Sequence, residues 1–242
     1  MTYRECSPSP PLNGLVAAYW GVDSAVDGEP TVQKILPDGC ADLICDFSGW
    51  PHMRWVGTMT RAIEVAAGGH RDLFGIRFAP GGLFPLLGVP LSLLTDDSVP
   101  FGALPAPLWR PPLQEWCEDS SFAARCRLAD TSLLAMLPRL QSATIAGALR
   151  RLSLQPVLPS TAAALADDIG VGLRTLQRRF MDQLGVSPRQ HLRYLRFERA
   201  RQLLLRRDHR AADIAAIAGY SDQAHFVREF RRFTGVTPGR WR

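Results

Sequence analysis

The sequence has no long apolar run, few cysteines and no recognisable secretion signal, and each shortage excludes something. No uncharged apolar stretch reaches roughly eighteen residues, so neither a membrane span nor a membrane partner is predicted. The five cysteines are odd in number and scattered, which argues against a disulfide framework and favours a reducing compartment. The first residues lack the basic and apolar regions of a signal peptide, so we expect the chain in the cytoplasm.

Motifs of common enzymes are absent too. There is no G-x-S-x-G and no H-E-x-x-H, and the glycine run at 79–82 has no lysine or helix start suited to a phosphate. Asp38, Asp42 and Asp46 follow a turn and share one side of a predicted strand, which we interpret as a solvated face. The sequence therefore predicts no catalytic residue, no metal site, no cofactor and no enzyme activity.

Positive charge is concentrated in the last third of the chain. From residue 155 onward, 16 arginines outnumber 8 acidic residues, a net charge of +8, whereas residues 1–154 carry −3. A basic segment joined to an acidic remainder is typical of a nucleic-acid-binding module attached to another domain. Lys34 is the only lysine beside 27 arginines, a bias that genome composition explains equally well.

Residues 161–188 and 211–238 are two copies of one pattern. Because there are only two copies, they indicate a duplicated supersecondary unit and not a solenoid. Each copy has a short helix, a glycine, a turn and a second helix, which is the order of a helix-turn-helix unit. The matched pairs are Ala166/Ala215, Gly170/Gly219, Arg178/Arg228, Phe180/Phe230, Gly185/Gly235, Val186/Val236 and Pro188/Pro238.

The second helix of each copy is predicted to have a buried stripe and an outward face. In the first copy, Gly170 ends the first helix, and Leu173, Leu176 and Phe180 recur at helical spacing as the stripe. The outward residues there are Arg174, Gln177, Arg178 and Met181.

In the second copy, Ser221 is the expected N-cap and the stripe is aromatic. Its members are Phe226, Phe230 and Phe233, whose helical spacing favours core packing over base stacking. The outward residues are Gln223, Ala224, Val227, Arg228 and Arg231, with His225 at the edge.

Between the copies, Ser187-Pro188 is a helix start and residues 189–207 are predicted to form one long helix. Its length is on the order of 30 Å, close to the roughly 34 Å of one turn of B-DNA. Such a rod could hold two helices in successive major grooves on one face of a duplex.

Residues 160–242 resemble the DNA-binding domain of the AraC family of bacterial transcription regulators. The resemblance is carried by RTLQRRF with LGVSP, by RFERARQLL, and by IAAIAGYSDQAHFVREFRRFTGVTPGRWR. It implies a two-lobed, all-helical domain that reads two adjacent major grooves of promoter DNA, and contact with RNA polymerase. Carried over by motif position, base reading falls to Arg174, Gln177, Arg178, Gln223, Ala224, His225 and Arg228.

The arginines Arg179, Arg232 and Arg240 are better suited to phosphate, which adds affinity without sequence information. The alternative for both sets is a solvated helix face, but the polar face occurs twice in register with the repeat, which favours DNA. Two departures from the family weaken the resemblance locally. Gly172 replaces a capping serine, and Ala211 with Ala212 replaces larger apolar residues.

The first part of the chain is predicted to be rich in β-strands, forming a small sheet or barrel. Pro85 limits the run at 83–87 to about one helical turn. A proline-rich stretch at 90–112, a helical stretch at 113–152 and a stiff hinge at 155–159 follow. The expected strands are 31–36, 41–47, 54–58, 62–66 and 73–78.

The fold class is therefore α+β, with three predicted parts. They are a β-rich N-terminal sensor or dimerisation domain at 1–105, a helical connector at 106–154, and the DNA-binding domain at 155–242 with two helix-turn-helix units joined by a long helix. The segments LPDGCADLICDF, VGTMTR and FGIRFAPGGLFPLLGVPLSLLTDDSVPF resemble a domain of undetermined role found ahead of AraC-type modules. The resemblance implies a small-molecule effector or a homodimer, formed through the helical connector, and leaves that choice open.

Two other functions compete with a sequence-specific regulator. Cys40 and Cys45, with Cys6 and His52, could make a metal or thiol sensor or a repair protein targeted to DNA, although the C-x₄-C spacing is weak for zinc. The third alternative is a non-specific DNA-packaging protein, which a specific-to-random affinity ratio near one would favour.

Overall fold

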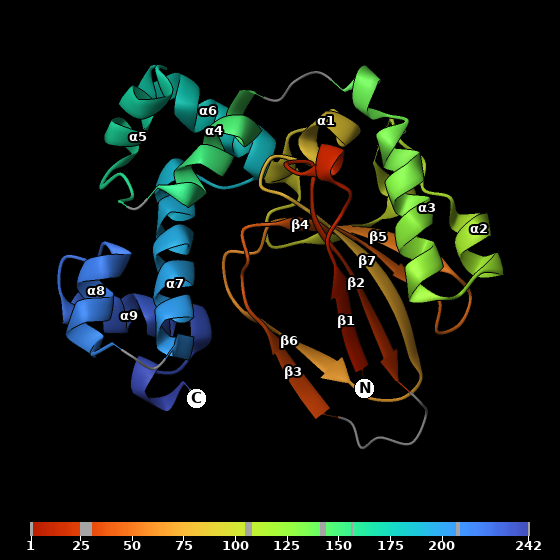
Figure 1. Ribbon diagram of the computed structural model, residues 1–242, viewed down its shortest axis with the longest axis horizontal. Helices are drawn as coiled ribbons and strands as arrows, with labels where there is room; N and C mark the ends of the chain where they lie inside the picture. The colour runs from red at the N-terminus through yellow and green to blue at the C-terminus, as the bar shows by residue number, and fades with distance from the viewer. Residues whose placement is uncertain are drawn as a thin grey trace.

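The structure is a computed structural model that describes residues 2–24, 31–104, 108–140, 144–155, 157–206 and 209–241. A β-rich N-terminal part lies beside an all-helical C-terminal part. The long helix of the C-terminal part lies on the side that faces the strands (Figure 1). The predicted α+β class is confirmed. Within the described residues, no helix is both long and apolar enough to cross a membrane.

The N-terminal part contains a six-stranded antiparallel sheet in the order β1-β2-β7-β4-β5-β8 and a separate two-stranded sheet, β3-β6. Residues 36–40 connect β3 to β4, yet these two strands belong to different sheets. The strands are β1 (Thr2–Cys6), β2 (Val16–Ser24), β3 (Thr31–Ile35), β4 (Ala41–Asp46), β5 (His52–Val56), β6 (Ile63–Ala67), β7 (Arg71–Phe78) and β8 (Ser98–Pro100).

The two faces of the large sheet have different partners because side chains alternate along each strand. One face, with Tyr19, Leu43 and Phe74, shares a core with α2 (Leu113–Glu118) and α3 (Phe122–Leu134). The other face lies opposite β3 and β6 across a cavity. The short helix α1 (Phe84–Leu87) ends at Gly88, which has a positive φ of 67°.

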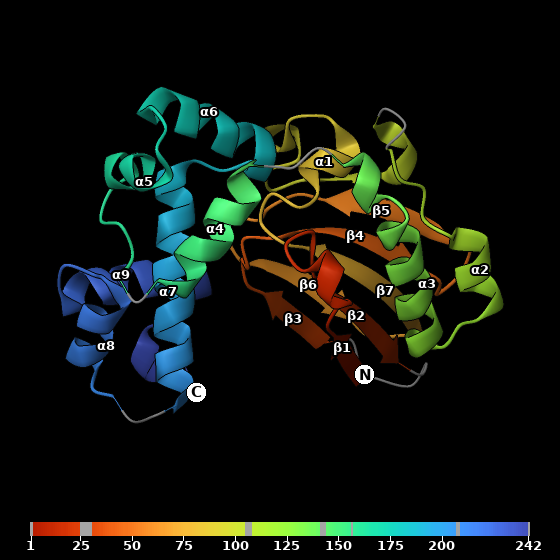
Figure 2. The same cartoon turned by 45° about the horizontal axis from the view of Figure 1, so that its top comes forward.

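The C-terminal part has two cores, one for each lobe. The first core includes α4 (Thr144–Leu154), which precedes the repeat in sequence. In both views α4 lies beside the long helix (Figure 2). The second core is built on the aromatic residues of α7 and α9. The remaining helices are α5 (Ala162–Ile169), α6 (Leu173–Leu184), α7 (Pro188–Arg206), α8 (Ala211–Ala218) and α9 (Gln223–Thr234).

The structure corrects two local predictions. Leu173 is 40% exposed and not part of the buried stripe, because it is the first residue of α6 and precedes the turn that packs inward. Asp222, not Ser221, is the N-cap of α9, since its carboxylate accepts a hydrogen bond from the His225 backbone N–H. The strands β1, β2 and β8 lie outside the five strands expected from the sequence.

The single long helix between the repeats and the single turn at Pro85 are confirmed. The three-part division of the chain stays a prediction. In the structure α2 and α3 pack with the N-terminal core, whereas α4 packs with the first lobe. Pro156, within the predicted hinge, lies outside the described residues.

Candidate nucleic-acid interface

In the first lobe, a small apolar core positions α6 so that its polar face is exposed. Thr161 caps α5 through its hydroxyl, and Gly170 ends that helix with a φ of 74°. In α6 Leu176 and Phe180 are fully buried, which turns the opposite face outward. The predicted residues Arg174, Gln177 and Arg178 all lie on that exposed face.

Gly172 begins α6 without any side-chain cap, as the departure from the family motif suggested. The start of α6 therefore lacks the side-chain cap that α9 has, and the Leu176 N–H donates to the Gly172 carbonyl at 3.0 Å.

The second lobe has a better capped helix with the same design. Asp222 Oδ1 accepts from the His225 N–H at 2.7 Å, and Ser221 Oγ donates to the same carboxylate at 2.9 Å. These bonds hold the pKa of Asp222 below its usual value. His225 is half-buried, with its ring at 5.3 Å from that of Tyr220. The predicted residues Gln223, Ala224 and Arg228 are exposed.

Of the arginines predicted to contact phosphate, Arg232 and Arg240 are exposed and Arg179 is half-buried. Other arginines serve the fold. Arg193 of α7 forms a two-point ion pair with Glu229 of α9, with Nη2 donating to Oε1 at 2.9 Å. Arg196 donates to the carbonyls of Pro159 and Ser160 at 3.1 and 3.0 Å. Sequence alone did not separate these arginines from those that face outward.

The N-terminal part touches the C-terminal end of both outward-facing helices. Each helix ends at a glycine with positive φ, Gly185 at 77° and Gly235 at 78°. Thr95 Oγ1 donates to the Gly185 carbonyl, and the Lys34 ammonium lies beside Gly235. A cation at a helix C-terminus interacts favourably with the helix dipole.

A third contact joins α7 to the turn between β3 and β4. The ring of Tyr194 covers Gly39 so closely that an added Cβ would lie 2.7 Å from Cε1. Gly39 also has a φ of 73°, so both the contact with Tyr194 and the backbone conformation require glycine there. Just before the turn, Leu36 packs against the core of the second lobe.

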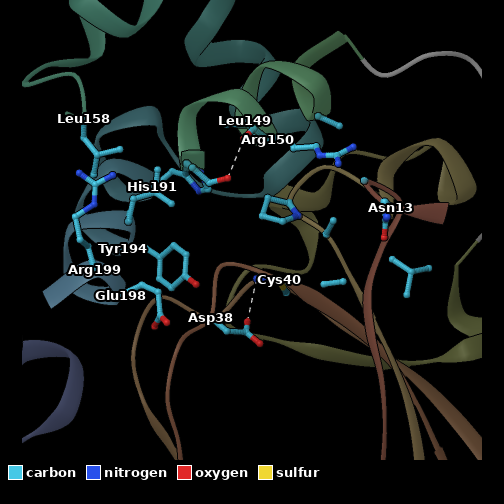
Figure 3. A pocket seen from close by; sticks show the side chains of 18 of the residues that line it. Asn13, Asp38, Cys40, Leu149, Arg150, Leu158, His191, Tyr194, Glu198 and Arg199 are labelled. Carbon is cyan, nitrogen blue, oxygen red and sulfur yellow. Dashed lines mark hydrogen bonds between the residues drawn. The ribbon is translucent and has the colours of Figure 1, made fainter. Parts of the chain in front are cut away.

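The parts enclose a cavity of about 600 Å³ between them (Figure 3). Tyr194 and Glu198 enter it from α7, Arg150 from α4, and Asp38 with Cys40 from the N-terminal part. His191 lies in its wall beside Phe180, with ring centres 5.7 Å apart. Burial lowers the pKa of His191 to about 4, which keeps the ring neutral.

A second cavity of about 390 Å³ lies between the two sheets. Asp38, Asp42 and Asp46 all line it, and their interpretation as a solvated face is wrong for Asp42, which is largely buried. The Asp42 side chain is only 15% exposed, and it accepts a hydrogen bond from Trp20 Nε1 at 2.7 Å. Burial, and then the charge of Asp38, raise the pKa of Asp42 to about 7.

The cysteines are arranged differently from the predicted sensor. Cys45 is buried in the N-terminal core, and Cys40 is buried beside the cavity between the parts. Cys6 instead lies next to Cys126 of α3, with the two Sγ atoms 3.2 Å apart. In the described part of the chain, no group of three or more His, Cys, Asp or Glu side chains could hold a metal ion.

Two family models match separate stretches of the chain. Residues 165–242 match a family described as a helix-turn-helix domain, and residues 4–100 match a domain of unknown function, DUF6597. A stretch of 75 residues is 42% identical to the HTH-type transcriptional activator RhaS of Escherichia coli, covering 31% of this chain and 27% of RhaS. The C-terminal part is an AraC-type helix-turn-helix domain. The matched stretch thus spans about a quarter of RhaS, and the rest of that protein has no counterpart in the match.

Comparison with solved structures finds matches of low TM-score. An AraC-type regulator from Chromobacterium violaceum is 29% identical, covering 40% of this chain and 86% of that chain with a TM-score of 0.37. ToxT from Vibrio cholerae is 9% identical, covering 99% of this chain and 96% of that chain with a TM-score of 0.43. The AraC-type domain of this chain contains all seven of the residues predicted to read bases.

Proposed function

We propose that this protein is a sequence-specific, DNA-binding transcription regulator whose AraC-type domain reads two successive major grooves of promoter DNA. The α6 face would read one groove through Arg174, Gln177 and Arg178. The α9 face would read the next through Gln223, Ala224, His225 and Arg228. Arginine suits guanine and glutamine suits adenine in the major groove.

The observation that carries this proposal is the pair of exposed polar faces on helices that occupy equivalent places in a repeat. In a helix-turn-helix unit, this outward face of the second helix is the one that enters the major groove. The 19 residues of α7 extend about 28 Å, close to one turn of B-DNA at roughly 34 Å. The α7–α9 ion pair of Arg193 and Glu229 fixes the second reading helix to this rod.

Control by the N-terminal part belongs to the same proposal. Its contacts lie at the far end of each reading helix, at Gly185 and Gly235, so they leave the reading faces open. A shift of the N-terminal part would therefore change the relative direction of α6 and α9. A small effector in the cavity between the sheets is the proposed source of that shift.

Dimerisation and contact with RNA polymerase are further parts of the proposal. The leucines of α4 are largely engaged in the first lobe, so a dimer would form through other surfaces of the connector helices. Sedimentation at micromolar concentration tests this, since a strict monomer on and off DNA removes the dimer. The similarity to RhaS, which is named an activator, supports activation as the direction of control.

Selection of bound sites from random duplexes tests the proposed function. We expect a motif with two recognised blocks whose centres are roughly 10 base pairs apart, one for each lobe. A motif with one block would remove the two-groove reading. Recovery of no motif at all, with equal affinity for every duplex, would favour a DNA-packaging protein.

A further inference from the structure

The cavity between the sheets has a fitted aromatic floor. Trp20 of β2 is in register with Gly75 of β7, and its indole lies directly over that glycine. A Cβ at Gly75 would lie 2.0 Å from Trp20 Cε2, so glycine is required for the ring to lie flat. The indole then reaches β4, where Nε1 donates to Asp42 Oδ1. Trp20 therefore lines the cavity between Gly75 and Asp42.

Negative charge is in excess at this deep end. Arg77 has three carboxylates around it, with Asp38 Oδ2 at 2.8 Å from Nε, Glu5 Oε2 at 3.4 Å from Nη1 and Asp42 Oδ1 at 3.9 Å from Nε. The Asp38 contact lacks hydrogen-bond geometry, so this nitrogen stays unsatisfied. One guanidinium therefore faces three carboxyl groups, and because the pKa of Asp42 is raised to about 7, a further cation beside it would favour the ionised form of Asp42.

Asp42 is the acid with room for a new partner. Only its Oδ1 receives a hydrogen bond among the described residues, from Trp20. Of the two aromatic residues in the lining, Trp20 lies beside this carboxyl and Tyr3 is the other. The face of an aromatic ring attracts an ammonium group, most strongly when the ring is tryptophan.

The rest of the cavity limits what can carry that cation. Its middle is apolar, with Val22, Ile44 and Leu73 in the wall. At its outer end His52 and Arg54 are exposed, and the one acid of the lining there, Asp46, already interacts with His52 and Arg71. A second positive charge on the ligand would find no free carboxylate at this end, so the lining fits one cation on an apolar body.

We propose that this cavity binds a small organic monoamine, with its ammonium group between Asp42 and the Trp20 ring and its apolar body along β2 and β4. The volume of about 390 Å³ falls in the range of ligand pockets. This inference rests on the proposed function, because it names the chemical class of the effector.

Asp38 connects this site to the DNA-binding part. It lines both cavities, and it precedes Gly39, on which Tyr194 of α7 lies (Figure 3). An ammonium group beside Asp42 would change the electrostatic interaction of Arg77 with Asp42 and Asp38. We expect amine binding to change, through Asp38, how tightly the turn at Gly39 packs against Tyr194.

Calorimetric titration of the full chain without DNA tests the proposal. The probe is phenethylamine, compared with its alcohol, phenethyl alcohol, and with phenylpropionate, followed by a panel of larger primary and secondary monoamines. We expect binding by monoamines and none by the alcohol or the carboxylate. Equal binding of the alcohol, preference for the carboxylate, or no heat with any monoamine would overturn the proposal.

Two variants locate the site. Asp42→Asn keeps an acceptor for Trp20 and loses the charge, so we expect amine affinity to fall about tenfold or more. Asp23→Asn is the matched control, because Asp23 is exposed on β2 and lies outside the lining of this cavity, and it should bind as the parent does. If Asp42→Asn binds with unchanged affinity, the amine is elsewhere. Site selection on the amine-free protein is independent, so failure here leaves the DNA-binding proposal standing.

Discussion

Replacing Gly185 with alanine probes the contact between the N-terminal part and the first reading helix. Gly185 ends α6 with a φ of 77°, and an added Cβ would lie 2.6 Å from Thr95 Oγ1 and 2.8 Å from the Leu91 carbonyl oxygen. Gly170 ends α5 with a φ of 74° and has nothing within 4 Å of the same position. The two glycines therefore share the backbone strain and differ only in the contact.

The magnitudes follow from that difference. Gly170→Ala should cost about 1–2 kcal/mol, the usual penalty for a left-handed conformation with a Cβ. Gly185→Ala carries the same penalty and about 1–3 kcal/mol more for overlap with a carbonyl that cannot move freely. The measurement is the free energy of unfolding in urea, together with affinity for the selected DNA site.

We expect Gly185→Ala to change DNA affinity even after allowance for its lower stability, because the overlap pushes the N-terminal part away from α6. Gly170→Ala should leave affinity for DNA unchanged. Equal loss of stability in both variants, with the same DNA affinity, would refute the reasoning that this contact controls the reading helix.

Three further predictions concern single groups. Arg178→Ala should lower discrimination at one base by about 1–3 kcal/mol, roughly 5-fold to 150-fold, whereas Arg232→Ala should weaken all sequences alike and reduce the salt slope by about 0.9; equal losses on selected and random DNA for both variants contradict this division. His191 is buried with a pKa lowered to about 4, whereas its pKa in the unfolded chain is near 6.5. The stability that the neutral ring provides is complete above pH 6.5, and the free energy of unfolding should fall by on the order of 3 kcal/mol as the pH is lowered toward 4. A His191→Phe variant whose free energy of unfolding falls just as steeply would refute this. Mild oxidation should link Cys6 to Cys126, detected as a cross-linked peptide by mass spectrometry; DNA affinity that then changes and recovers with reductant would support the thiol-sensor alternative.

The helical part of the fold could be predicted because its determinants are local. Gly170 ends its helix through its own backbone conformation, which does not depend on distant parts of the chain. The spacing of Leu176 and Phe180 likewise defines a buried face within one helix. The two errors there are also local. Ser221 and Asp222 are adjacent and both can cap, and sequence alone does not say which residue takes the position.

The N-terminal site could not be predicted, since its determinants are distant in sequence. The order of strands in the large sheet pairs β2 with β7 and β4 with β7, across gaps that no turn signal specifies. The sequence of its own strand predicts a solvated Asp42. The cavity around Asp42 is closed by β3 and β6, which belong to a separate sheet. Cys6 and Cys126 likewise meet across 120 positions.

The location of the contacts between the two parts decides what kind of control is available. An N-terminal part that covered Arg178 or Arg228 would act by competing with DNA, and its release would be all or none. In this structure those arginines are exposed, while the contacts are at Gly185 and Gly235, behind the reading faces. If both helices must enter their grooves together, as we propose, a small change in their relative direction would be sufficient for regulation. Spacing between the blocks should therefore be more sensitive to an effector than the sequence of either block.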